Sequence, residues 1–173
     1  NYSSAKIDKY RDNLINPYKF KNNHSKLKNL KILHVTNFNE RHDGRLFYNT
    51  GRRINNGFIR LNHSVLELSD RDIVSYSRKI TDFKGSHKLN SKLIDIVSNY
   101  VPDLMVFGHA DLIDNKTIEF IKMNYPNTKM CQWFLDRMDG EWKSNKNRFI
   151  KKMHLMDANF CTTSTSIVLS EPT

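Results

Sequence analysis

Five short apolar runs recur along the chain from Lys31 onward, and longer polar segments separate them. Each run is rich in Val, Ile, Leu, Met or Phe and carries few polar residues. Such runs are typical of strands that are buried on both faces of a parallel sheet. The pattern predicts strands at residues 31–36, 64–69, 103–108, 129–134 and 158–163.

The segments between these runs have helical periodicity. Apolar residues return at roughly helical spacing from Arg45 to Leu61 and again from Leu89 to Tyr100. Asp114 is expected to cap a third helix, which ends before Pro126. Ser144 is expected to cap a fourth helix in the same way.

Strict alternation of strands and helices predicts right-handed crossovers and a parallel sheet that is covered on both faces. The expected fold class is α/β, a Rossmann-like, doubly wound parallel sheet of about five or more strands. We expect this domain to span residues 30–173 and to follow a basic N-terminal extension, residues 1–29. The extension is expected to pack a short helix on the domain, with a membrane-surface arm as the alternative.

Composition and charge narrow the classes of partner. Hydrophobic residues make up 38% and aromatic residues 11%, which excludes disorder of the chain as a whole. The formal net charge is +10, which favours nucleic acid, anionic membranes or phosphorylated small molecules. The lysines are spread along the chain, so a generally Lys-rich and Asn-rich composition explains the charge equally well.

Cysteine usage and hydropathy bear on the compartment. The two cysteines, Cys131 and Cys161, lie in strand-like runs without CxxC spacing, which predicts reduced, buried thiols. The sequence has no apolar run of about 18 residues and no visible signal peptide. We expect a cytoplasmic protein, with peripheral membrane contact as the alternative. Because the chain begins with Asn1 rather than Met, we expect it to be part of a longer product.

In parallel sheets, ligands bind beyond the carboxyl ends of the strands, so the loops there hold the candidate site residues. The loop after the first strand reads "TNFNERHDGR". Gly44 at the start of the predicted helix would bring backbone N–H groups close to an anion, and arginines would contact a phosphate or carboxylate. The alternative is a surface loop in which Asp43 caps the helix. The candidate substrate-binding residues are Asn39, Arg41, Asp43, Gly44 and Arg45.

The next loop carries Asp70 and Asp72 on either side of Arg71. A DxD-type pair can hold a metal ion bound to a nucleotide diphosphate. Two carboxylates after a strand are more often helix caps or partners of a nearby arginine, so we predict no metal site. Since GxGxxG is absent as well, we expect no dinucleotide cofactor.

The loop after the third strand, "GHAD", supplies the catalytic candidates. Gly108 allows close approach of a substrate. His109 can take a proton from a hydroxyl group, and the carboxylate of Asp111 can orient the imidazole. The alternative is that Asp111 caps the next helix and His109 packs against its neighbours.

The loop after the fourth strand, "WFLDRMDGEW", adds Asp136 and Arg137 as substrate-binding candidates. Trp133 is expected in the core, and Trp142 is expected to line a site or contact another domain. The sequence has no Ser-His-Asp order, HExxH motif, Walker loop or zinc spacing. The commoner hydrolases and P-loop enzymes are therefore disfavoured.

Several segments together resemble a known family. They are "KILHVTNFNERHDGRLFYNTGRRINNGFIRLNHSVLELSDRD", "PDLMVFGHADLIDNKTI", "MCQWFLDRMD" and "DANFCTTS". From about Lys31 to Ser164 the chain resembles the N-terminal half of bacterial GT-B glycosyltransferases, especially the CgeB-like and family-4-like group. The DGR and GHAD segments are fairly specific in combination, although each alone is weak.

The resemblance implies a two-domain enzyme that moves a sugar from a nucleotide-sugar donor to a glycan or lipid-linked acceptor. The N-terminal domain mainly contacts the acceptor, and a C-terminal half binds the donor. It also implies that the Asp43–Gly44–Arg45 loop, His109 with Asp111, and Asp136 face the reaction. Because the chain ends near the expected interdomain crossover, we expect it to be inactive without the donor half. The alternative is a non-catalytic module for an anionic ligand or nucleic acid. Nucleic acid is disfavoured because the polar candidates gather at the strand ends.

Overall fold

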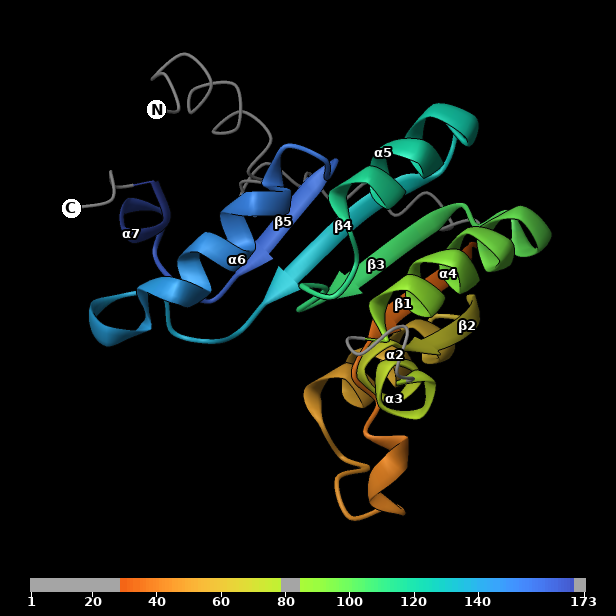
Figure 1. The fold of residues 1–173 in the computed structure, drawn as a ribbon, viewed down its shortest axis with the longest axis horizontal. Coiled ribbons are helices and arrows are strands. Elements are labelled where there is room, and N and C mark those ends of the chain that lie inside the picture. Colours follow the sequence, from red (N-terminus) through yellow and green to blue (C-terminus); the bar gives the residue numbers. More distant parts are fainter. Residues whose placement is uncertain (1–28, 79–84, 170–173) are drawn as a thin grey trace.

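The computed structural model describes residues 29–78 and 85–169, which form a five-stranded, all-parallel sheet flanked by helices (Figure 1). The strand order is β2-β1-β3-β4-β5. The predicted α/β, Rossmann-like class is confirmed. The strands are β1 (Lys31–Thr36), β2 (Ser64–Ser69), β3 (Leu104–Gly108), β4 (Lys129–Phe134) and β5 (Ala158–Cys161).

The strand predictions differ from the structure only at two ends. β3 begins one residue later than predicted, and β5 ends two residues earlier. Asp103, predicted as the first residue of β3, instead contacts the start of β1, where its side chain accepts a hydrogen bond from the Lys31 N–H at 2.8 Å. β5 is an edge strand that pairs only with β4, so its pairing ends where β4 ends, at the Phe134–Cys161 pair.

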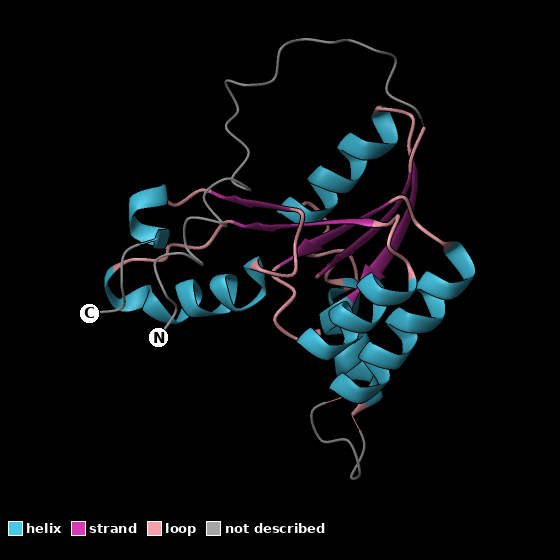
Figure 2. Ribbon diagram, turned by 90° about the horizontal axis from the view of Figure 1, so that it is seen from above, coloured by secondary structure: helices cyan, strands magenta, loops and turns pink. Residues whose placement is uncertain are grey.

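Helices cover the two faces of the sheet, and Figure 2 shows them from above. Between β1 and β2 lie η2 (Glu40–His42) and α2 (Thr50–Arg60). Between β2 and β3 lie α3 (Asp70–Ser77) and α4 (Ser86–Tyr100). The remaining helices are α5 (Asn115–Asn124), η3 (Gly140–Trp142), α6 (Lys143–Met153) and α7 (Thr165–Leu169).

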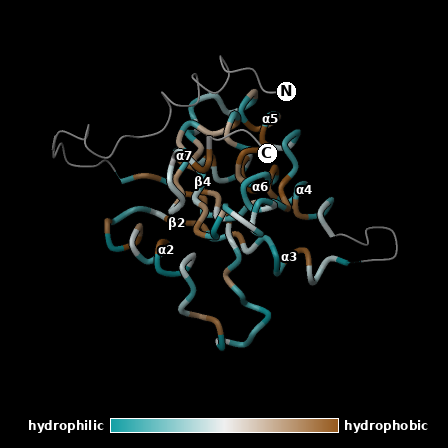
Figure 3. Tube along the Cα trace, turned by 90° about the vertical axis from the view of Figure 1, so that its left-hand side faces the viewer, coloured by the Kyte–Doolittle hydropathy of each residue, from teal (hydrophilic) through white to brown (hydrophobic). Residues whose placement is uncertain are grey.

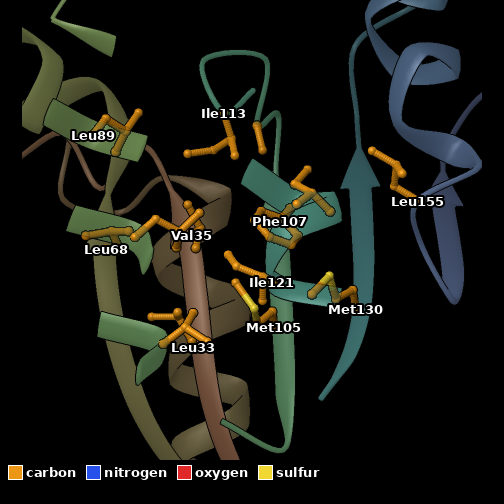
Figure 4. Close-up of a cluster of buried hydrophobic side chains, with 14 of the residues drawn as sticks. Leu33, Val35, Leu68, Leu89, Met105, Phe107, Ile113, Ile121, Met130 and Leu155 are labelled. Atoms are coloured by element: carbon orange, nitrogen blue, oxygen red, sulfur yellow. The ribbon is translucent and has the colours of Figure 1, made fainter. Parts of the chain in front are cut away.

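The larger core lies between the sheet and the helices α3, α4 and α5. It follows from strand alternation, because Leu33 and Val35 of β1 point to the same face as Met105 and Phe107 of β3. Hydrophobic stretches lie in the middle of the trace around β4, and further hydrophobic positions occur at its edge, among them the tip of the projecting loop (Figure 3). Figure 4 shows this core, whose labelled members are Leu33, Val35, Leu68, Leu89, Met105, Phe107, Ile113, Ile121, Met130 and Leu155.

The opposite face carries a smaller apolar cluster under α2. Ile32, Val106 and Trp133 are its buried members, and Ile54 and Phe58 of α2 pack against them. The expected core position of Trp133 is therefore confirmed.

The helix predicted to start at Arg45 starts at Thr50 instead, and Asn49 is its N-cap. The side chain of Asn49 accepts a hydrogen bond from the Arg52 N–H at 2.8 Å. Asp43 does not cap this helix, because it has a left-handed backbone with φ 50° and ends η2. Gly44, with φ 84°, lies in the projecting loop rather than at the helix start.

Four further helices differ from the predictions. α6 begins one residue before Ser144, so Ser144 is not its cap. Asp114 takes the N-cap position of α5 but makes no capping hydrogen bond with its side chain. α3 and α7 were not predicted, since both are short and α3 begins with the charged residues "DRD" directly after a strand.

The predicted basic extension falls outside the described residues except for Asn29. Cys131 and Cys161 are free thiols that are partly rather than fully buried. Within the described part of the chain, no helix combines the length and the apolar character needed to cross a membrane.

Candidate functional site

The strand order places a topological switch point between β1 and β3. β1 and β3 are neighbours in the sheet, although β2 and the helices η2, α2, α3 and α4 separate them in the chain. In doubly wound sheets with this order, ligands bind at the carboxyl ends of the strands near the switch point. The loops that begin at Asn37 and His109, and the start of α3 at Asp70, are therefore the parts of the structure where a site is expected.

The loop after β1 is held in place by Asp72, which is buried in α3. The Asp72 carboxylate accepts hydrogen bonds from the Glu40 N–H at 2.8 Å and from Nη1 of Arg41 at 2.8 Å. The Ser69 hydroxyl also donates to it. Burial acts to raise the pKa of Asp72, but these hydrogen bonds and the Arg41 charge together lower it below its usual value. Asp72 is therefore the partner of a nearby arginine, as the sequence suggested for this pair.

Asn39 and Arg41 are thus engaged within the protein. Asn39 has a left-handed backbone, and its side-chain oxygen accepts a hydrogen bond from Nδ2 of Asn37 at 2.9 Å. Arg41 retains partial exposure beyond its ion pair with Asp72. Both residues shape the loop, which reduces what they can offer to a ligand.

Asp43, Gly44 and Arg45 are exposed at the projecting end of this loop. A side chain at Gly44 would meet no atom within 4 Å, so no neighbour crowds this position. Nη2 of Arg45 lies 3.5 Å from Nδ1 of His42. Among the described residues, none of these three forms a hydrogen bond or ion pair with the residues after β3 and β4 that the sequence grouped with them.

Gly108 is explained by packing. A Cβ atom at this position would overlap the indole ring of Trp133 and approach Oγ1 of Thr36 to 2.5 Å. Glycine therefore lets β1, β3 and β4 pack together at their carboxyl ends. The sequence predicted that Gly108 leaves room for a substrate, but Trp133 and Thr36 fill the space next to it.

His109 follows Gly108 and has a left-handed backbone with φ 52°. Such a conformation is strained for a residue with a side chain and is frequent at functional sites. The imidazole stacks on Phe134 with ring centroids 4.2 Å apart and meets Trp133 edge-on. It is thus fixed over the end of β4.

Both ring nitrogens of His109 have partners. Nε2 accepts a hydrogen bond from the Leu135 N–H at 3.3 Å, so the ring proton lies on Nδ1. Nδ1 lies 3.4 Å from Oδ2 of Asp136. The sequence predicted that Asp111 orients the imidazole, whereas in the structure the imidazole contacts Asp136.

The pKa of His109 is lowered, chiefly by burial. Asp136 and Asp111 act to raise this pKa, while the guanidinium groups of Arg148 and Arg71 act to lower it. The imidazole is therefore neutral at neutral pH. A neutral ring with its proton on Nδ1 carries that proton on the side of the ring that contacts Asp136.

Asp111 lies between two arginines that come from different helices. Its Oδ1 accepts a hydrogen bond from Nη2 of Arg71 in α3 at 3.0 Å and forms an ion pair with Nη2 of Arg148 in α6 at 2.9 Å. Arg148 also lies over the ring of Phe134, 5.5 Å from its centroid. All three charged side chains keep between a quarter and just over a third of their exposure. We call His109, Asp111, Asp136, Arg71 and Arg148 the edge cluster.

Sequence reasoning missed Arg71 and Arg148 as site residues. Arg71 was seen only as the residue between two aspartates, and Arg148 lies in a Lys-rich helix with no local motif. A signal for Arg71 exists, because it directly follows a strand on the carboxyl side, where the other candidates were found. Arg137, which was predicted, forms an exposed ion pair with Asp139 instead of joining the cluster.

Asp70 lies beside the cluster in an unusual state. It is 1% exposed, and its Oδ2 has no hydrogen-bond partner within the described structure. Burial raises the pKa of Asp70 to about 7, although the Arg71 N–H and the Arg71 charge oppose this shift. A substantial fraction of Asp70 is therefore protonated at neutral pH.

The charges of the edge cluster balance. Arg71 and Arg148 are positive, Asp111 and Asp136 are negative, and His109 is neutral. A balanced set of fixed donors and acceptors beside aromatic rings suits hydroxyl groups better than it suits a polyanion. In the described residues, no three His, Cys, Asp or Glu side chains are grouped as ligands for a metal ion.

No protein-family model, curated protein or solved structure matches this chain. The resemblance to GT-B glycosyltransferases therefore stays a prediction from the sequence. The function is therefore inferred from the geometry of the edge cluster.

Proposed function

We propose that this chain is the acceptor-side domain of a bacterial glycosyltransferase and that the edge cluster binds hydroxyl groups of a sugar-bearing acceptor. The observation that carries the proposal is the carboxylate of Asp111, which two guanidinium groups hold in one orientation at the carboxyl edge of the sheet. Carboxylates and guanidinium groups in fixed geometry accept from and donate to vicinal hydroxyl groups. Because the acceptor is a glycan or a lipid-linked sugar, hydroxyl recognition is what this domain needs.

The same geometry supports a division of roles between Asp136 and His109. Nε2 of His109 is occupied by the Leu135 N–H, so the imidazole does not take a proton from substrate there. Asp136 is 52% exposed, and its Oδ2 lies 3.4 Å from Nδ1 of His109. We assign Asp136 as the base that accepts the proton of the attacking hydroxyl and His109 as the residue that positions it.

The donor belongs to another part of the enzyme in this proposal. In GT-B enzymes, which the chain resembles, a second Rossmann-like half holds the nucleotide sugar and stabilises the diphosphate. Within the edge cluster the two arginines share the carboxylate of Asp111, and the carboxylate of Asp136 brings the charge of the cluster to zero, so it offers little surplus positive charge for a diphosphate. Transfer therefore requires both halves.

The alternative is a module that binds nucleic acid or another polyanion through the basic helix α6. Two of its lysines, Lys146 and Lys152, are buried, and Nζ of Lys152 donates to the side chain of Asn115 at 3.0 Å and to the carbonyl of Ile113. These lysines are not displayed on a surface that could track a phosphate backbone. A polyanion-binding face would need them exposed together.

The test is shift mapping by NMR on the isotopically labelled 173-residue chain. Methyl glycosides of glucose, galactose, mannose and N-acetylglucosamine serve as probes. We expect shifts in residues 108–111 and 134–137. The substitution Asp111→Asn should weaken binding by roughly tenfold or more, because a hydrogen bond to a charged group is lost. Asp95→Asn on the exposed side of α4 is the matched control and should leave binding unchanged.

Two results would contradict the proposal. Shifts confined to another part of the chain would remove the edge cluster from sugar binding. Salt-dependent binding of a mixed-sequence oligonucleotide that Asp111→Asn does not change, with no response to any glycoside, would favour the polyanion module.

A further inference from the structure

The loop between β1 and α2 displays three consecutive apolar side chains to solvent. Leu46 is 41% exposed, Phe47 is 44% exposed and Tyr48 is 78% exposed. This segment, orange in Figure 1, projects from the body of the domain beyond the carboxyl end of β1. Adjacent exposed apolar residues at a projecting tip are unusual for a surface that meets only water.

The tip rests on a rigid support. The guanidinium of Arg52 lies between two aromatic rings, 4.5 Å from the ring centroid of Phe38 and 5.1 Å from that of Phe47. Nη1 of Arg52 donates to both oxygens of Glu67, at 2.5 and 2.6 Å. The other end of the loop is held by Asp72 through Glu40 and Arg41. A loop fixed at both ends presents its apolar residues at low entropic cost.

Basic residues adjoin this apolar tip. Arg45 precedes it and Arg53 follows it; both are exposed, and neither forms an ion pair with a carboxylate in the described part of the chain. Glu40 and Asp43 in the same loop offset these charges locally. The long-range attraction to an anionic surface therefore comes from the net charge of +10 on the whole chain.

We propose that the segment Arg45–Tyr48 inserts its apolar side chains into the headgroup region of an anionic membrane, with Arg45 and Arg53 at the phosphate level. Aromatic and aliphatic residues beside arginines are the composition of interfacial contacts. The convex shape of the tip fits a deformable bilayer surface. The membrane contact is thus placed on this loop rather than on the N-terminal extension considered from the sequence. This inference does not rest on the proposed function.

The test is co-sedimentation of the 173-residue chain with vesicles of phosphatidylcholine containing about one-third phosphatidylglycerol, in roughly 0.15 M salt. Leu46→Ser/Tyr48→Ser spares Phe47, which supports Arg52, and should weaken vesicle binding by roughly tenfold. The matched control is Ile59→Ser/Leu61→Ser at the other end of α2, where the side chains are 52% and 60% exposed. The control should bind as the unchanged chain does.

A charge series and a depth measurement complete the design. Arg45→Gln and Arg53→Gln should each weaken binding about fivefold, whereas Arg60→Gln at the far end of α2 should not. With brominated lipids, Tyr48→Trp should add a quenched and blue-shifted emission that Leu61→Trp does not add. Trp133 and Trp142 contribute equally to both variants.

Three outcomes would overturn the inference. The first is that the unchanged chain does not bind vesicles, and the second is that Leu46→Ser/Tyr48→Ser does not weaken vesicle binding. The third is that the unchanged chain self-associates, whereas the Leu46→Ser/Tyr48→Ser variant neither self-associates nor binds vesicles. The last outcome would show that a second copy of the chain covers the tip. Sugar binding at the edge cluster is measured separately, so failure here leaves the proposed function intact.

Discussion

The indole ring of Trp133 occupies the space in which a Cβ atom of Gly108 would lie. At the carboxyl ends of the two strands, the Trp133 ring of β4 therefore packs directly against the Gly108 backbone of β3. His109 continues from this contact, and its own ring meets Trp133 edge-on with centroids 5.3 Å apart. The packing of a glycine thus determines where the candidate imidazole stands.

We expect Gly108→Ala to destabilise the protein by about 2–3 kcal/mol, because an added methyl group must displace a ring and a strand. Gly57→Ala in α2 is the matched control, since a Cβ there meets no atom within 4 Å. This control should gain roughly 0.5–1 kcal/mol from helix propensity. Urea unfolding curves measure both. A neutral Gly108→Ala would mean that the packing does not explain this glycine.

A chain of hydrogen bonds crosses the smaller core under α2. Nε1 of Trp133 donates to Nε2 of His34 at 3.4 Å, and Nδ1 of His34 therefore carries the proton that Oδ1 of Asn55 accepts at 3.2 Å. Asn55 donates to Glu67, which Arg52 also binds. The imidazole of His34 is fully buried and has no free nitrogen for a second proton.

Burial lowers the pKa of His34 from 6.5 to about 4, and the nearby Arg52 charge acts in the same direction. In the unfolded chain His34 binds a proton below about pH 6.5, whereas in the folded chain it binds this proton only below about pH 4. Stability from this group is therefore present above pH 6.5 and falls by up to about 1.4 kcal/mol per pH unit toward pH 4. The pH dependence of unfolding in the unchanged chain and in His34→Gln isolates this contribution. Equal slopes for both proteins would contradict it.

Asp70 has the opposite linkage. Its folded pKa is about 7 against 3.8 when unfolded, so its stabilising effect is complete below pH 3.8 and is lost as pH rises through 7. Asp70→Asn removes this loss but leaves an amide N–H₂ without a clear partner. We expect a net gain of about 2 kcal/mol at pH 8 and a smaller or negative change at pH 5. Urea unfolding curves of the variant and of the unchanged chain at pH 8 and pH 5 measure the difference in free energy of unfolding. A variant that is less stable than the unchanged chain at both pH values would contradict the prediction.

The strands could be predicted because burial on both faces makes them continuous apolar runs. Leu33, Val35, Met105 and Phe107 are apolar for the same physical reason that the sheet is parallel. The start of α2 could not be predicted in this way. Apolar residues at Leu46 and Phe47 continue the helical spacing, yet they belong to the exposed loop tip.

The edge cluster was only partly accessible from the sequence. His109, Asp111 and Asp136 could be predicted because ligands bind beyond the carboxyl ends of parallel strands, and each of these residues lies in the loop after a strand. This rule could not decide which carboxylate the imidazole meets, because that depends on how far the turn after each strand extends. Arg148 comes from the middle of a helix and reaches Asp111 across the fold, so no local pattern indicates it.

The pKa of His109 can distinguish the two carboxylates. Asp136 contacts Nδ1 and acts to raise this pKa more than Asp111 does, while the charge of Arg148 lowers it. Asp136→Asn should therefore lower the pKa of His109 further, and Asp111→Asn should lower it less. Arg148→Gln should raise it, because a positive charge near the imidazole is removed. Asp95→Asn on α4 is the control and should change nothing.

The measurement is an NMR titration of the His109 ring in each variant. His109→Gln identifies the resonance by its disappearance. A larger fall in Asp111→Asn than in Asp136→Asn would restore the pairing that the sequence suggested. It would also remove the assignment of Asp136 as the base that His109 positions. The predicted order instead ties the imidazole to Asp136 and leaves Asp111 to the two arginines, which is the arrangement on which the proposed hydroxyl binding rests.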